Sequence, residues 1–64
     1  MTALSDANRA LNRVADAAFS TAQAVHASDA DGIERAIQVL QNNMREAGVR
    51  CSALVSDIRS VVTR

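Results

Sequence analysis

The side chains with the greatest capacity for chemistry gather in one short stretch, which holds a histidine and two aspartates followed by a glycine. In Asp29-Ala30-Asp31-Gly32 the acidic residues precede the glycine, as they do in loops that bind calcium. When Gly32 takes the glycine position of such a loop, its two ends fall on Ala27 and Gln38, and neither carries a carboxylate. The stretch is therefore predicted to be a turn, with no metal ion and no other cofactor.

His26 precedes this stretch and is the single histidine of the chain. A general base needs a nucleophile or a substrate pocket beside it, and the neighbouring residues supply neither. A histidine at this place suits the negative end of a helix dipole. We therefore predict no catalytic residue and no enzymatic activity.

Cys51 is the single cysteine, so the chain cannot form an internal disulfide. We interpret it as a small buried hydrophobe in a helical seam, with a disulfide to a partner chain or a reactive thiol as alternatives. A lone cysteine fits a reducing compartment. No charged leader with an apolar core and no membrane-spanning apolar run is visible, so we expect a cytoplasmic protein, with signal-independent export as the alternative.

A mixed polar face on the first half of the chain carries Arg9, Asn12, Arg13 and Asp16. Helical hairpins can bind RNA through such a face, but affinity for nucleic acid comes mostly from neutralised phosphates. Here acidic residues cancel the arginines, the formal net charge of the chain is zero, and no aromatic stacking platform accompanies the face. We expect a solvated face and no nucleic-acid partner.

The elements that must position these residues are helices. The chain has no proline, two glycines and abundant alanine, a composition that favours helix over strand. A first helix over about residues 3–27 is predicted, with Thr2 or Ser5 as its N-cap. Its apolar row is spaced by seven residues and consists of Leu4, Leu11, Ala18 and Val25, with Ala7 and Val14 interleaved.

A turn over residues 28–31 is predicted because Ser, Asp and Gly side chains there satisfy backbone groups locally. Asp31 and Glu34 have the spacing of a capping box that opens a second helix over about residues 32–63. That helix carries an apolar seam over four heptads, and Gly48 is expected to be tolerated within it. The seam consists of Ile33, Ile37, Leu40, Met44, Ala47, Cys51, Leu54, Ile58 and Val61. Glu46 and Arg50 are expected to pair on its outside.

The predicted fold class is all-α: an antiparallel two-helix hairpin with a longer second helix, in one domain over residues 1–64 that assembles into an oligomeric bundle or a helical filament. Folding about the turn is expected to place Val25 near Ile33 and Leu4 near Leu54. The second helix then continues past the first, and its apolar residues there have no cover within the chain.

This uncovered segment leads us to expect a homo-oligomer, with a different helical protein as the other possible partner. The residues predicted to form the association surface are Phe19, Ile37, Leu40, Met44, Cys51, Leu54, Val55, Ile58, Val61 and Val62. The predicted function is a non-enzymatic, self-associating module, either a bundle or a filament subunit. The alternatives are a small adaptor or chaperone for another helical protein, for example in a secretion system, and an RNA-binding regulator.

Two families share this layout. The near-equal length and the Asp-Ala-Asp of the turn resemble the small helical-hairpin RNA-binding regulators of plasmid copy number, a resemblance that implies two hairpins paired in a four-helix bundle. The RNA-reading phenylalanine flanked by lysines and amides in that family has no counterpart here. Ser28-Asp29 and the ending over residues 57–64 are similar to needle subunits of type III secretion systems, which implies a filament, although the prolines around that family's turn are absent.

Overall fold

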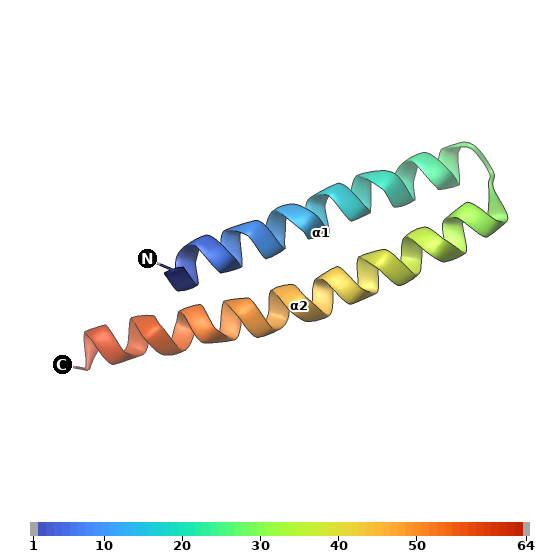
Figure 1. The fold of residues 1–64 in the computed structure, drawn as a ribbon. Coiled ribbons are helices and arrows are strands. Elements are labelled where there is room, and N and C mark those ends of the chain that lie inside the picture. Colours follow the sequence, from blue (N-terminus) through green and yellow to red (C-terminus); the bar gives the residue numbers. More distant parts are fainter. Residues whose placement is uncertain (1, 64) are drawn as a thin grey trace.

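The computed structural model describes residues 2–63, which form two helices and no strand: α1 (Thr2–His26) and α2 (Ala30–Val62). The helices lie side by side in opposite directions, and the pair measures 53 × 14 × 13 Å (Figure 1). The predicted all-α hairpin with a longer second helix is confirmed. Met1 and Arg64, the ends of the domain predicted over residues 1–64, lie outside the described residues.

The turn is built from the backbone ends of both helices. Ser28 adopts a φ of 55°, and its N–H donates to the carbonyl of Val25 (3.0 Å), while the Asp29 N–H donates to the carbonyl of Ala24 (3.2 Å). These two bonds satisfy the last carbonyls of α1 in the pattern of a Schellman motif. The chain therefore reverses direction within three residues.

Asp29 also caps α2, because its Oδ1 accepts a hydrogen bond from the N–H of Gly32 at 3.1 Å. The predicted capping box of Asp31 and Glu34 is thus wrong, since α2 begins two residues earlier than expected and Asp31 lies in its first turn. The N-caps predicted for α1 are also wrong, because Thr2 and Ser5 both lie inside the helix.

The contact between the helices is made on α1 by small residues. Ala7, Ala10 and Ala17 are 1%, 3% and 7% exposed, and Val14 between them is half-buried. The residues of α1 that face α2 alternate in spacing between four and three and consist of Ala3, Ala7, Ala10, Val14, Ala17, Thr21 and Ala24. Thr21 is accommodated because its hydroxyl donates to the carbonyl of Ala17 at 2.8 Å.

The row predicted to face α2 does not do so. Leu4, Leu11 and Val25 are 52%, 51% and 56% exposed, and Ala18 is exposed as well, so this row flanks the contact. Alanine on the inner row lets the two backbones approach closely, because the distance between packed helices depends on the side chains at the contact. The larger residues are displaced to one side of the hairpin.

On α2 the contact follows the predicted seam more closely. Its inward residues are Ile33, Ala36, Ile37, Leu40, Asn43, Ala47, Cys51 and Leu54, of which Ala47 is buried and the others are half-buried. Met44, which was predicted within this seam, is 55% exposed. α2 is continuous across Gly48, as expected.

α2 extends beyond the N-terminal end of α1, so its last turns have no neighbour in the hairpin (Figure 1). Val55, Ile58, Val61 and Val62 in this part of α2 are between 47% and 78% exposed. Thr63 closes the helix, because its backbone N–H and its hydroxyl both donate to the carbonyl of Arg59.

Candidate functional site

The hairpin has two long flanks, one on each side of the contact between α1 and α2. Because the helices face each other and run in opposite directions, positions rotated in the same sense away from the contact lie on the same side of the pair. On α1, Leu4 and Leu11 each follow an inward alanine by one residue; on α2, Ile37 and Met44 each follow the inward Ala36 and Asn43 by one residue. These residues of the two helices therefore share one flank.

We call this side the apolar flank and define it by two rows in which the spacing alternates between four and three residues. The row on α1 consists of Leu4, Asn8, Leu11, Ala15, Ala18, Ala22 and Val25, and the row on α2 consists of Ile37, Gln41, Met44, Gly48, Cys51, Val55, Ile58 and Val62. No member of either row is charged. Each row is a second heptad seam on a helix whose first seam is already used within the chain.

The opposite side, the charged flank, has a different composition. One shallow hollow there is lined by Asp6, Arg9 and Arg13 of α1 together with Glu46 and Arg50 of α2. Arg50 Nε donates to Glu46 Oε1 at 2.9 Å, which confirms the predicted pair. Side chains on this flank compensate one another in charge and remain in contact with water, because both partners of the ion pair are more than 40% exposed.

A second hollow on the same side is lined by residues of both helices, among them Asp16 and Ser20 of α1 and Val39 and Asn43 of α2. Together with the first hollow it places these polar residues of α1 beside residues 39–50 of α2. Arg9, Arg13 and Asp16 of the polar face considered for RNA lie here, beside an acidic residue of each helix.

The predicted association residues divide into two groups. Those that are exposed are Phe19, Met44, Val55, Ile58, Val61 and Val62, and those that are half-buried at the contact with α1 are Ile37, Leu40, Cys51 and Leu54. The structure brings Ile37, Met44, Cys51, Val55, Ile58 and Val62 together along the apolar flank. Phe19 lies elsewhere, on the outer face of α1 beside a hollow that Ala22, Gln23 and His26 help to line.

Sequence reasoning missed the flank on α1. Leu4 and Leu11 were assigned to the contact with α2 because they are the largest apolar residues in a heptad row. The signal that could have corrected this is the parallel row from Ala3 to Ala24, which keeps the same spacing without a break one position earlier. Two adjacent seams on one helix indicate two packing partners.

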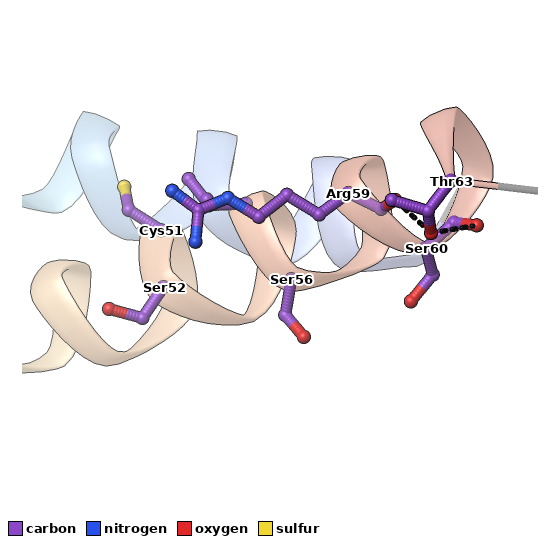
Figure 2. Close-up of a pocket in the computed structure, with 7 residues that line it drawn as sticks. Cys51, Ser52, Ser56, Arg59, Ser60 and Thr63 are labelled. Carbon is purple, nitrogen blue, oxygen red and sulfur yellow. Dashed lines mark hydrogen bonds between the residues drawn. The ribbon is translucent and has the colours of Figure 1, made fainter.

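A third hollow runs along the outer side of α2 and contains the only thiol of the chain. It is lined by Cys51, Ser52, Val55, Ser56, Arg59, Ser60 and Thr63, all of them from the one helix. Figure 2 shows the Arg59 side chain running back along α2 toward Cys51, with the serine hydroxyls directed outward and Thr63 bonded to backbone carbonyls. No second element closes this hollow, so it is an open surface of α2.

Within residues 2–63, no three His, Cys, Asp or Glu side chains lie close enough together to hold a metal ion. His26, Asp29 and Asp31 are all exposed at the turn end, where Asp29 is occupied in capping α2. In the same part of the chain, neither helix has the length and apolar character needed to cross a bilayer. The apolar flank is therefore the most extended surface feature of the described residues.

Comparison with protein-family models, with curated proteins and with solved structures finds no match to this chain. The argument for function consequently rests on the residues of the chain and on the surface that they form.

Proposed function

We propose that this chain is a non-enzymatic structural module that folds as a helical hairpin and associates with further copies of itself. The observation that carries the proposal is the mismatch between what the hairpin buries and what it exposes. The buried apolar residues within residues 2–63 are four alanines, while eleven large apolar side chains are 47–78% exposed.

The size of this mismatch supports association. Complete burial of a Val, Leu or Ile side chain contributes roughly 1.5–3 kcal/mol. The exposed Leu, Met, Val and Ile residues of the apolar flank therefore represent a free energy comparable with the whole stability of a small domain, about 5–15 kcal/mol. Chains of this length generally need a disulfide, a metal or a partner chain to be stable. A single cysteine cannot supply the first within the chain, and another copy supplies the third.

The test is a double substitution in the exposed end of α2. Ile58→Asp with Val61→Asp places two charges where the proposal requires burial, so the solution mass should fall to that of one chain or the helicity should be lost. The matched control is Ser56→Asp with Ser60→Asp, which adds the same charge to the same turns at exposed polar positions. Light scattering after size exclusion gives the mass, and circular dichroism gives the helicity.

The control should retain both the mass and the helicity of the unmodified protein. Unchanged mass and helicity in the Ile58→Asp, Val61→Asp variant would refute self-association through this part of α2.

A further inference from the structure

The apolar flank has a spacing that determines how a second hairpin fits it. We propose, resting on the self-association above, that a second copy of this chain packs on the apolar flank with its helices antiparallel to the first. α2 then faces α2 of the partner and α1 faces α1, around a two-fold axis that passes near residue 46 of α2. The product is a closed four-helix bundle of two chains.

The antiparallel direction follows from the exposed end of α2. If both turns lay at the same end of the assembly, the two uncovered ends of α2 would also lie together, diagonally apart and still without neighbours. With the turns at opposite ends, the last turns of each α2 lie over the turn end of the other hairpin. The described part of α2 runs from Ala30 to Val62, so complete overlap places the axis at its midpoint, residue 46.

The rows of the flank independently select the same centre. In antiparallel helices, a residue of one row packs side by side with a residue of the other row from the partner. On α2 this places Met44 beside the partner's Gly48, and Ile37 beside the partner's Val55. On α1 the equivalent arrangement places Leu11 beside the partner's Ala15. Large side chains thus meet small ones in both helix pairs, as dense packing requires.

Gly48 has a role in this arrangement that it lacks in the hairpin. A Cβ atom added at Gly48 would have no side-chain or long-range neighbour within 4 Å, so packing within the hairpin does not require glycine. A mid-helix glycine is unfavourable for helix formation relative to alanine. In the bundle, its missing side chain makes room for the partner's Met44.

Charge and area also favour a second copy as the occupant. An uncharged surface meets itself without repulsion, and the charged flanks remain outside the bundle in water. A face of 53 × 14 Å has a footprint of about 700 Å², so two copies bury on the order of 1,400 Å², which lies within the range of stable interfaces. Glu34, one turn before Ile37, falls at the rim, where its carboxylate can reach water.

Cysteine cross-linking tests this arrangement directly. Gln41 is exposed and comes to lie beside the partner's Cys51, so Gln41→Cys with the native Cys51 retained should give a covalent dimer when oxidised with diamide. The two thiols of one chain are ten residues, or about 15 Å, apart along the helix and cannot pair with each other. The same separation keeps the two native Cys51 thiols of the dimer apart, so the unmodified protein should remain uncrosslinked.

The matched control is Asn42→Cys, one residue along and exposed on the outer side of α2, which should not give a covalent dimer. If the protein has the mass of two or more chains but Gln41→Cys fails to cross-link more than Asn42→Cys, this arrangement is wrong and self-association stands. Cross-linking of the unmodified protein through Cys51 would also contradict it, because the axis would then lie nearer residue 51 or the helices would be parallel. A helical protein with the mass of one chain would refute both proposals.

A second measurement does not depend on thiols. Gly48→Leu fills the space assigned to the partner's Met44, so the dissociation constant of the dimer should rise at least tenfold, while helicity of the dilute chain is unchanged or higher. Val49→Leu, at an exposed position on the outer side, should leave the dissociation constant within threefold. An equal or tighter dimer in Gly48→Leu would overturn the central contact.

Discussion

The two flanks of the hairpin share the same helices and the same contact row, yet they differ in chemistry. One carries acidic and basic side chains from both helices, including the ion pair of Glu46 and Arg50. The other carries two uncharged rows with Leu, Met, Ile and Val at exposed positions. The difference teaches that the hairpin is one half of a core: one side is finished for contact with water, and the other has the spacing of a helical interface.

Placing a charge on each flank in turn should break this comparison with the largest effect. Met44 and Val39 are 55% and 53% exposed, so they are equivalent in the hairpin and differ only in the flank that they occupy. Met44→Asp should weaken association by at least ~100-fold, because an unpaired charge is strongly disfavoured in an apolar interface. Val39→Asp should change it by less than about threefold, as expected for an exposed surface site. Sedimentation over a range of concentrations measures both constants, and equal effects would contradict the distinction between the flanks.

A smaller effect should separate the inner row of α1 from the flank beside it. Ala17 is 7% exposed at the contact with α2, whereas the adjacent Ala18 is exposed on the apolar flank. Ala17→Leu overpacks the contact and should lower the free energy of unfolding by about 1–3 kcal/mol. Ala18→Leu should leave the free energy of unfolding of the hairpin within about 0.5 kcal/mol.

Urea denaturation at a concentration where the chain is monomeric gives both values. The reverse order, with Ala18→Leu the more damaging change, would restore the row of Leu4, Leu11, Ala18 and Val25 to the inner contact.

The smallest effect is expected on the charged flank. Glu46→Gln removes the ion pair with Arg50, and exposed pairs four residues apart on a helix contribute only about 0.3–0.5 kcal/mol. Thermal denaturation at low and high salt should show a small loss that disappears in high salt. A loss above about 1 kcal/mol, or one insensitive to salt, would mean that this flank is also a buried surface.

Much of the fold is predictable from the sequence, because alanine-rich helices with a sustained heptad spacing and one Ser-Asp-Gly break define a hairpin. The course of α2 through Gly48, the exposed end of α2 and the pairing of Glu46 with Arg50 follow from spacing alone. The cap is a different matter: Asp29 and Asp31 are both suitable, and the Schellman turn at Ser28, which depends on backbone geometry, selects Asp29.

The inner face of α1 could not be predicted by ranking residues on hydrophobicity. Size favoured Leu4, Leu11 and Val25, whereas close approach of the backbones favoured the adjacent alanines. Only a helix with two partners can use both rows, so the interpretation of α1 depends on how many helices surround it. The residues that were assigned to the hairpin core on α1 instead lie on the candidate association surface.

The measurement that tests the central claim most directly is the solution mass over a dilution series, with helicity followed in the same samples. We expect a mass above the 6.8 kDa of one chain, near that of two chains, and helicity that falls as dilution separates them. A chain of single mass that stays fully helical and cooperatively folded at every concentration would contradict the account, because the apolar flank would then need no partner.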